Sequence, residues 1–231
     1  MYANNSEIRS PYLCDPKTTA CFSGHRPEKL PINLNSQTHA EAYRSYIYLH
    51  IHEAYLKGYR TFITGMARGF DILAATAVIN YRHRFNVTEK INLIGVSPFS
   101  EEVNRLNCHD RFNYNFVKDN CDEMIYLNRE YAPWCYSQRN RFMVDHSSLV
   151  ICSCIEEKSG TGQTVKYARK KGLEIDNISV KDILSIPEND YPLPRDGMWI
   201  FGDEKVGTVT RITSAHPFLP VNDTSDNKKK Q

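Results

Sequence analysis

Short apolar runs alternate with longer segments of helical periodicity through the middle of this chain. The apolar runs have the length of strands and lie at 18–23, 59–64, 91–96, 123–127, 149–155 and 173–178. The helical patterns lie between them at 36–56, 70–82, 101–117, 136–147 and 164–171. Strands that alternate with helices usually form a parallel sheet with helices on both faces. The pattern therefore predicts an α/β fold, a Rossmann-like three-layer sandwich with a mostly parallel sheet.

The two ends of the chain lack this alternation, which predicts one folded domain with two flanking segments. Residues 1–16 are interpreted as an N-terminal leader and residues 17–186 as the domain. Residues 187–231 form a C-terminal extension in which proline and glycine interrupt any regular pattern. Within this extension, 198–201 and 206–212 could form a β-hairpin, and we expect the polar end of the chain to be disordered.

Charge and hydropathy exclude several classes of partner. The chain has 231 residues with 29 basic and 27 acidic side chains, so no strong net field attracts it to a nucleic acid. No apolar stretch is long enough to span a bilayer, and the polar residues 1–10 lack the core of a signal peptide. We therefore expect a cytoplasmic protein with neither a membrane nor a nucleic acid as its partner.

The cysteines do not indicate disulfides or a metal site. Their number, seven, is odd, and their spacing is irregular, which is typical of reduced thiols. Cys152 and Cys154 would share one face of a strand, but no second Cys/His pair lies nearby in the sequence to complete a zinc site. We expect neither a bound metal nor a resident cofactor.

Three turns that contain glycine each follow a strand-like run and lead into a helical pattern. They span 23–27, 65–71 and 159–164. Turns of this kind lie at the carboxyl edge of a parallel sheet, where α/β proteins bind ligands. Glycine permits close approach of a ligand to the backbone, and unpaired amides at a helix N-terminus favour an anion. One such turn alone is ordinary turn chemistry, whereas three at one edge predict a cradle for a phosphorylated molecule.

Side chains at the first two turns suit such a ligand, although each also has an ordinary structural explanation. Arg26 offers a planar set of donors that matches phosphate, and His25 could bond to phosphate or ribose or stack on a base. Alternatively, His25 is a loop histidine bonded to the backbone and Arg26 an ordinary surface residue. Asp71 could accept ribose hydroxyls or could cap its own helix.

A fourth segment, 134–140, adds aromatic and polar side chains before a predicted helix. Trp134 and Tyr136 could stack on a base or could belong to the core, while Arg139 and Asn140 could point into a cleft. The candidate ligand-binding residues are Ser23, Gly24, His25, Arg26, Gly65, Met66, Ala67, Gly69, Asp71, Pro98, Phe99, Trp134, Arg139, Asn140, Gly160, Thr161, Gly162 and Thr164.

In this order the motifs resemble those of the YpsA-like branch of the SLOG superfamily. The matching motifs are Gly24-His25-Arg26-Pro27, Thr64-Gly65-Met66-Ala67 with Gly69 and Asp71, Pro98-Phe99, Arg139-Asn140 with Met143-Val144-Asp145, and Gly160-Thr161-Gly162 with Thr164, Tyr167 and Ala168. The resemblance covers about residues 18–180. It implies a pocket for a nucleotide-derived small molecule, either ADP-ribose-like or a nucleoside phosphate. It also implies a homodimer or a higher homo-oligomer.

The resemblance leaves three functions open, because the superfamily includes LOG phosphoribohydrolases and Smf/DprA recombination proteins. LOG enzymes carry a catalytic glutamate on the helix after the glycine-rich turn, whereas Lys166 and Tyr167 stand there in this chain. We therefore expect binding, as a sensor or by sequestration, without turnover. The first alternative is a hydrolase of an N-glycosidic or phosphate bond in a nucleotide, with no catalytic residue assigned. The second is a DNA- or protein-interaction module with a relic pocket.

Overall fold

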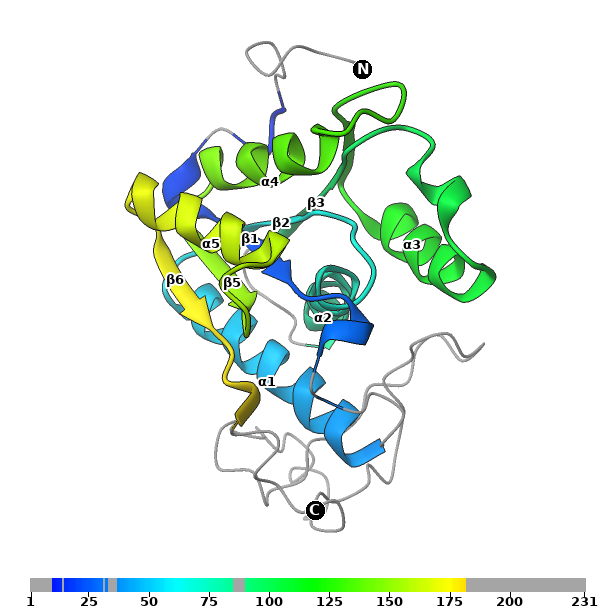
Figure 1. Ribbon diagram of the computed structural model, residues 1–231. Helices are drawn as coiled ribbons and strands as arrows, with labels where there is room; N and C mark the ends of the chain where they lie inside the picture. Colours follow the sequence, from blue (N-terminus) through cyan, green and yellow to red (C-terminus); the bar gives the residue numbers. More distant parts are fainter. Residues whose placement is uncertain (1–9, 14, 31, 33–36, 85–89, 182–231) are drawn as a thin grey trace, which may run out of the picture.

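The computed structural model describes residues 10–13, 15–30, 32, 37–84 and 90–181. At its centre is a six-stranded sheet with the strand order β4-β3-β2-β1-β5-β6, in which all neighbouring strands are parallel (Figure 1). The strands are β1 (Thr19–Gly24), β2 (Thr61–Thr64), β3 (Asn92–Ser97), β4 (Glu123–Tyr126), β5 (Leu149–Ser153) and β6 (Glu174–Asn177). The predicted α/β class and parallel sheet are confirmed.

Helices cover both faces of this sheet and complete the three layers. The α-helices are α1 (Gln37–Leu56), α2 (Phe70–Arg84), α3 (Cys108–Asn120), α4 (Cys135–Asp145) and α5 (Gly160–Lys171). Three short 3₁₀ helices are η1 (Pro16–Thr18), η2 (Pro27–Lys29) and η3 (Glu102–Arg105). In Figure 1, α4 and α5 lie on one side of the sheet, and α1 and α2 lie on the other.

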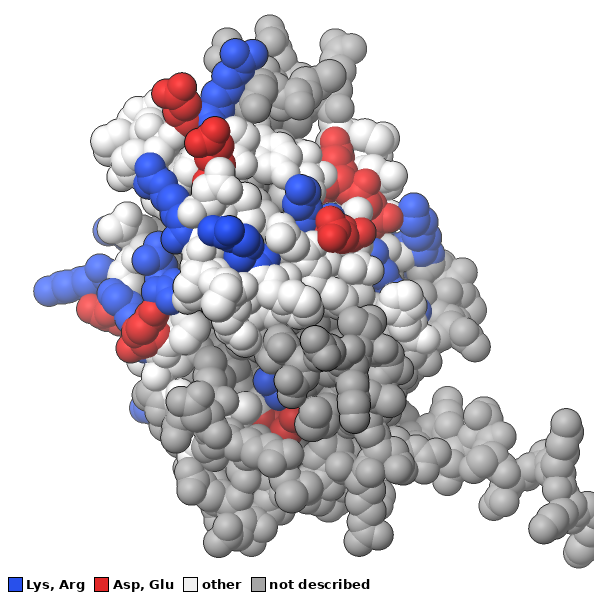
Figure 2. Space-filling model, turned by 90° about the vertical axis from the view of Figure 1, so that its right-hand side faces the viewer, with Lys and Arg blue, Asp and Glu red and all other residues white. Residues whose placement is uncertain are grey.

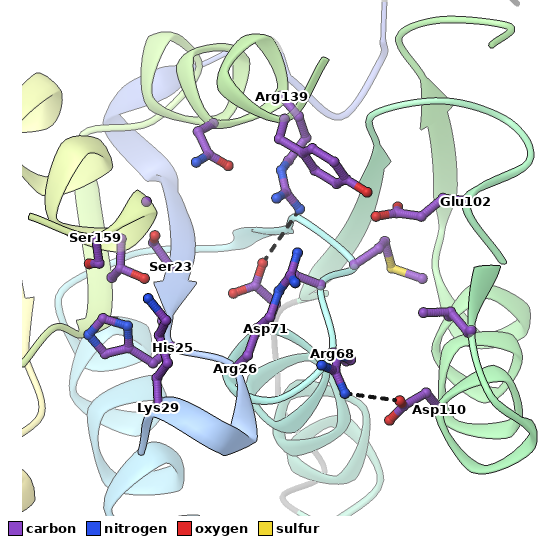
Figure 3. Close-up of a pocket in the computed structure, with 18 of the residues that line it drawn as sticks. Ser23, His25, Arg26, Lys29, Arg68, Asp71, Glu102, Asp110, Arg139 and Ser159 are labelled. Carbon is purple, nitrogen blue, oxygen red and sulfur yellow. Dashed lines mark ion pairs between the residues drawn. The ribbon is translucent and has the colours of Figure 1, made fainter. Parts of the chain in front are cut away.

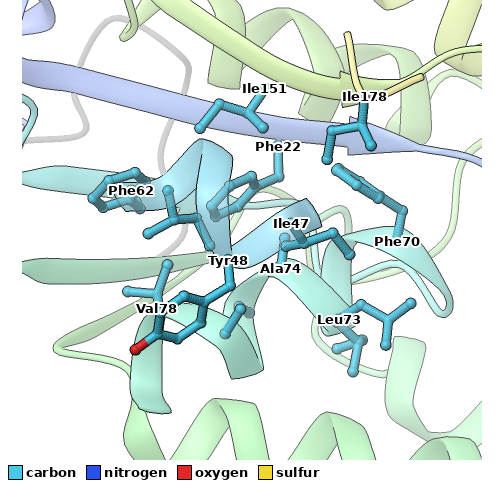
Figure 4. Packing of buried hydrophobic residues seen from close by; sticks show 14 of the residues in the cluster. Phe22, Ile47, Tyr48, Phe62, Phe70, Leu73, Ala74, Val78, Ile151 and Ile178 are labelled. Carbon is cyan, nitrogen blue, oxygen red and sulfur yellow. The ribbon is translucent and has the colours of Figure 1, made fainter. Parts of the chain in front are cut away.

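Two apolar cores hold the layers together, one on each face of the sheet. On the face of α1 and α2, Phe22 and Phe62 project from neighbouring strands and their rings stack at 5.8 Å (Figure 4). Phe70, at the start of α2, contacts Phe22 edge to face at 6.5 Å. On the opposite face, Phe142 of α4 and Val165 of α5 belong to one buried cluster with residues of β1, β2, β3 and β5. Strands buried on both faces explain why their sequences are apolar runs instead of alternating patterns.

Two helices differ from the predicted boundaries because of their caps. The predicted helix 101–117 is divided into η3 and α3, since Asn107 accepts a hydrogen bond from the amide of Asp110 at 2.8 Å and caps α3. The predicted helix 164–171 begins earlier, at Gly160, because the Ser159 hydroxyl accepts from the amide of Gly162 at 3.0 Å. α5 ends at Lys171, as predicted, and is capped by Gly172, which has a left-handed φ of 79°.

The flanking segments are described only in part. Residues 1–9 of the leader and all of 187–231, including the predicted hairpin, lie outside the described residues. Ser10 donates a hydrogen bond to Glu123 of β4, and the carbonyl of Tyr12 accepts from the Thr61 hydroxyl at 3.3 Å. The end of the leader therefore packs on the domain. In the described part of the chain, none of the helices has the length and apolar character needed to cross a membrane.

Candidate functional site

A pocket with a volume of about 640 Å³ opens at the carboxyl edge of the sheet, beside the ends of β1 and β5 (Figure 3). The chain leaves β1 toward β2 and leaves β5 toward β6, so the strand order reverses here, which is where open α/β sheets bind ligands. The pocket is lined by Ser23, Gly24, His25, Arg26, Lys29, Met66, Ala67, Arg68, Asp71, Glu102, Arg105, Leu106, Asn107, Asp110, Tyr136, Arg139, Asn140, Ser159, Gly160 and Thr161.

A buried ion pair lies in this pocket. Arg139 Nη1 of α4 is 3.8 Å from Asp71 Oδ2 at the start of α2, and the two side chains are only 7% and 5% exposed. The same Nη1 donates a hydrogen bond to the carbonyl of Gly65. Burial raises the pKa of Asp71 to about 6, although Arg139 and the amides of Gly24, Ala67 and Gly65 oppose the shift. Arg139 thus joins α4 to the start of α2 and to the turn after β2.

Glycine at the first two turns makes room for protein side chains rather than for a ligand. A Cβ atom on Gly65 would lie 2.6 Å from Asp71 Oδ2 and 2.9 Å from Arg139 Cζ. A Cβ atom on Gly24 would lie 2.5 Å from Cδ1 of the Phe70 ring and closer still to its Cγ. Gly69 has a φ of +90°, which L-residues rarely adopt. These glycines are therefore required by packing or by the backbone at the pocket edge.

Met66 is the one described residue other than glycine with a positive φ, 59°. It is 1% exposed and lines the pocket directly after Gly65. Its amide is held by the Thr64 hydroxyl at 3.3 Å. A left-handed conformation at a non-glycine residue is costly and concentrates at functional sites.

The third turn places the N-terminus of α5 at the pocket. Ser159, the capping residue, accepts from the amide of Gly162, while Gly160 and Thr161 line the pocket. A Cβ atom on Gly160 would contact nothing within 4 Å, so open space adjoins this first helical residue. Arg26 is exposed, and no ion pair to it is found among the described residues. These groups are those expected of an anion site.

His25 is bonded to the backbone, which was the structural alternative to a role in ligand binding. Its Nε2 accepts hydrogen bonds from the amides of Ile155 and Glu156 at 3.1 and 3.4 Å. Burial lowers its pKa, and the charge of Lys29 lowers it further. A neutral imidazole whose Nε2 accepts must carry its proton on Nδ1. His25 thus joins the end of β1 to the loop after β5.

Two other arginines at the pocket are already engaged by the protein. Arg68 pairs with Glu28 and, at 3.6 Å, with Asp110. The guanidinium of Arg105 lies over the rings of Phe99 and Tyr131 at 5.0 and 4.3 Å. Arg26 is therefore the arginine of the pocket with the fewest competing contacts.

Glu102 is a pocket residue that the sequence analysis did not single out. It is 6% exposed, and Ser97 Oγ donates to its Oε2 at 3.0 Å. Burial raises its pKa, while the charge of Arg139 and the bond from Ser97 lower it. An acid shortly after the strand end at Ser97-Pro98 could have indicated a site residue. Because a helix was predicted over 101–117, the sequence did not show whether Glu101 or Glu102 faced solvent.

The structure brings eleven of the predicted residues together and leaves seven outside. Among described residues, the pocket lining omits Gly65, Gly69, Pro98, Phe99, Trp134, Gly162 and Thr164. Phe99 is 1% exposed and packs edge to face on Tyr131 and Tyr136, whereas Trp134 is 54% exposed ahead of α4. The Thr164 hydroxyl donates to the carbonyl of Gly160 at 3.0 Å. A role in ligand binding remains a prediction for all eighteen residues.

One group of possible metal ligands lies on α1 and β6. The ligand atoms of His50, Glu53 and Asp176 are within 4.8 Å of one another. His50 Nδ1 is 2.8 Å from Asp176 Oδ2, so an ordinary hydrogen bond accounts for this arrangement. The hydrogen bond from Lys57 to Glu174 raises the pKa of Lys57, and the nearby charges of Asp176 and Glu53 raise it further. The group therefore gives no reason to assign a metal here.

Charges of both signs are mixed on the surface. On the face that Figure 2 shows, basic and acidic side chains are interspersed over the described part, without a continuous basic band. The near balance of 29 basic and 27 acidic residues gives the whole chain a net charge of only +2.

A parallel α/β sandwich with a polar pocket at the point where strand order reverses defines a Rossmann-like fold. The chain belongs to the YpsA family, described as the YspA SLOG family, whose model matches residues 20–183. The resemblance drawn from the motifs is therefore confirmed.

Individual relatives are more distant. The chain is 27% identical over 121 residues to the uncharacterized SPbeta prophage-derived protein YoqJ of Bacillus subtilis (strain 168), covering 47% of this chain and 69% of YoqJ. DNA processing protein A (DprA) of Streptococcus pneumoniae has a similar structure, with a TM-score of 0.49, 18% identity and 75% of this chain covered. The chain spans only 54% of that protein. DprA of Helicobacter pylori, a single-stranded DNA-binding protein, gives a TM-score of 0.45 at 18% identity, with 72% of this chain and 67% of that chain covered.

Proposed function

We propose that this protein binds a nucleotide-derived phosphorylated small molecule at the carboxyl edge of the sheet, as a sensor or by sequestration. The observation that carries the proposal is that Arg26 and the start of α5 line the same pocket. A guanidinium and the unpaired amides of a helix N-terminus both favour a phosphate group. The volume of about 640 Å³ falls in the range of small-molecule and cofactor sites.

A thermal-unfolding screen tests this proposal. The panel contains nucleoside monophosphates, dinucleotides, ADP-ribose and inorganic phosphate, with a single-stranded oligodeoxynucleotide titrated in parallel. A ligand at about 100 times its Kd stabilises the folded state by about 2.7 kcal/mol, which is readily measured. We expect a nucleotide or ADP-ribose to stabilise the protein. If no small molecule of the panel does so, or if only the oligonucleotide does, the proposal is wrong.

Hydrolysis is the second candidate, and Glu102 is the observation that favours it. Nucleotide cleavage at the N-glycosidic bond benefits from a carboxylate near the ribose, and Glu102 provides one from η3 although α5 has none. We still expect binding without turnover, because the other buried pocket carboxylate, Asp71, is held by Arg139 and backbone amides. Chromatography of incubated AMP decides between the two. Release of free base by wild type, and its loss in Glu102→Gln, would favour hydrolysis.

A further inference from the structure

Glu102 presents a buried carboxylate to the pocket with only one protein donor. Ser97 Oγ donates to Oε2, and no other hydrogen bond to this carboxylate is found within the described part of the chain. The residue is 6% exposed and lines the pocket. A buried carboxylate is costly unless hydrogen-bond donors surround it. Its second oxygen, Oε1, therefore suits a donor supplied by a ligand.

The position of Glu102 indicates which kind of donor this would be. Figure 3 shows its side chain directed into the pocket from the side opposite Ser159 and His25. The phosphate site that we propose lies at Arg26 and α5, so Glu102 would face another part of the same molecule. A second phosphate beside this carboxylate would be repelled, whereas a neutral hydroxyl group donates to it.

Asp71 is less suited to the same task. Arg139 Nη1 lies 3.8 Å from its Oδ2, and this guanidinium and the amides of Gly24, Ala67 and Gly65 stabilise its negative charge. Among the described residues, Glu102 has no ion pair and accepts one hydrogen bond, from Ser97. Of the two buried pocket carboxylates, Glu102 is therefore the one with fewer competing protein contacts.

We propose that Glu102 accepts hydrogen bonds from the vicinal hydroxyl groups of a ribose whose phosphate binds at Arg26 and the start of α5. The pocket then selects ribonucleotides and ribose phosphates over their 2′-deoxy counterparts. This inference rests on the proposed function, because it assigns the sugar of the same ligand. Its chemical basis is that two adjacent hydroxyls can donate to the oxygens of one carboxylate.

Isothermal titration calorimetry with matched ligand pairs tests this inference. The pairs are AMP with 2′-deoxy-AMP, and ribose 5-phosphate with 2-deoxyribose 5-phosphate, which removes the base. We expect wild type to bind the ribose form of each pair about tenfold more tightly, the scale of one charge-assisted hydrogen bond. In Glu102→Gln the difference should fall to about twofold or less. Glu101→Gln, which removes the same charge from an exposed neighbour, should keep the wild-type preference.

The possible outcomes separate this inference from the proposed function. If wild type binds AMP and 2′-deoxy-AMP equally, the assignment of Glu102 fails while the binding function stands. If wild type binds none of the four ligands, the assignment fails because the proposed function itself is wrong for this class of molecule. If Glu102→Gln keeps the full preference, another residue reads the sugar. Should that variant unfold, the wild-type ratio alone decides, and Ser97→Ala, which removes the donor to Glu102, should weaken the preference.

Discussion

Replacing Gly65 by alanine should destabilise the fold through the buried ion pair. The added Cβ would lie 2.6 Å from Asp71 Oδ2 and 2.9 Å from Arg139 Cζ. Ordinary contacts lie at roughly 3.5 Å, so these groups must withdraw by about 1 Å into a packed interior. Overpacking costs about 1–3 kcal/mol, and breaking a buried pair costs about 3–5 kcal/mol. We expect a loss of about 2–4 kcal/mol, because the pair is displaced but keeps both members.

Thermal unfolding measures this loss, and Gly160→Ala is the matched control. A loss of about 2–4 kcal/mol lowers the Tm by about 4–16 °C for a domain of this size. A Cβ atom added at Gly160 would meet nothing within 4 Å, so the control should stay within about 1 kcal/mol of wild type. In an Arg139→Met background the cost of Gly65→Ala should shrink, because the guanidinium is gone. Equal Tm values for the Gly65 and Gly160 variants would refute the steric argument.

Two further predictions concern affinity and pH. Arg26→Ala should weaken binding of a phosphorylated ligand by about 1.5–3 kcal/mol. Arg169→Ala, at the far end of α5, is the control and should leave the Kd unchanged. If calorimetry finds equal effects for the two variants, Arg26 does not belong to the site. The pKa of Asp71, about 6 in the fold and about 3.9 when unfolded, makes its contribution to stability fall as the pH rises from about 4 through 6. Chemical denaturation should show wild type losing about 2–3 kcal/mol relative to Asp71→Asn over that range, and a constant difference would contradict this.

The centre of the fold could be predicted from the sequence because each of the inner strands β1, β2, β3 and β5 carries its own signal. A strand buried on both faces is an apolar run whatever its neighbours are. The helices of the chain share the 3.6-residue period. The predicted helix 101–117 shows where such reasoning ends. The cap at Asn107 competes with helix continuation, and the outcome depends on one hydrogen bond to Asp110 that the residue pattern does not reveal.

The sequence predicted where the candidate site lies, but it did not predict which role each residue has there. Turns after strands of one parallel sheet must lie at one edge, which located the pocket from the glycines alone. The partners of those glycines come from distant segments: Gly65 lies against Arg139, and Gly24 lies against Phe70. Glu102 became visible only when η3 placed it beside the pocket. Long-range contacts of this kind leave no local signal in a single sequence.

The position of β1 in the sheet also has a consequence for folding. β1 pairs with β2 on one side and with β5 on the other, so Ser23 lies opposite Cys152 although more than half of the chain separates them. Contacts between such distant residues form slowly, because a long loop must close first. During synthesis, residues 19–24 must therefore remain without their second neighbour until 149–153 have emerged from the ribosome. The N-terminus of α5 follows β5 in the chain, so the proposed phosphate site is complete only after β5 has been made. A ligand bound there would by mass action favour chains in which β1 has paired with β5 over shorter nascent chains.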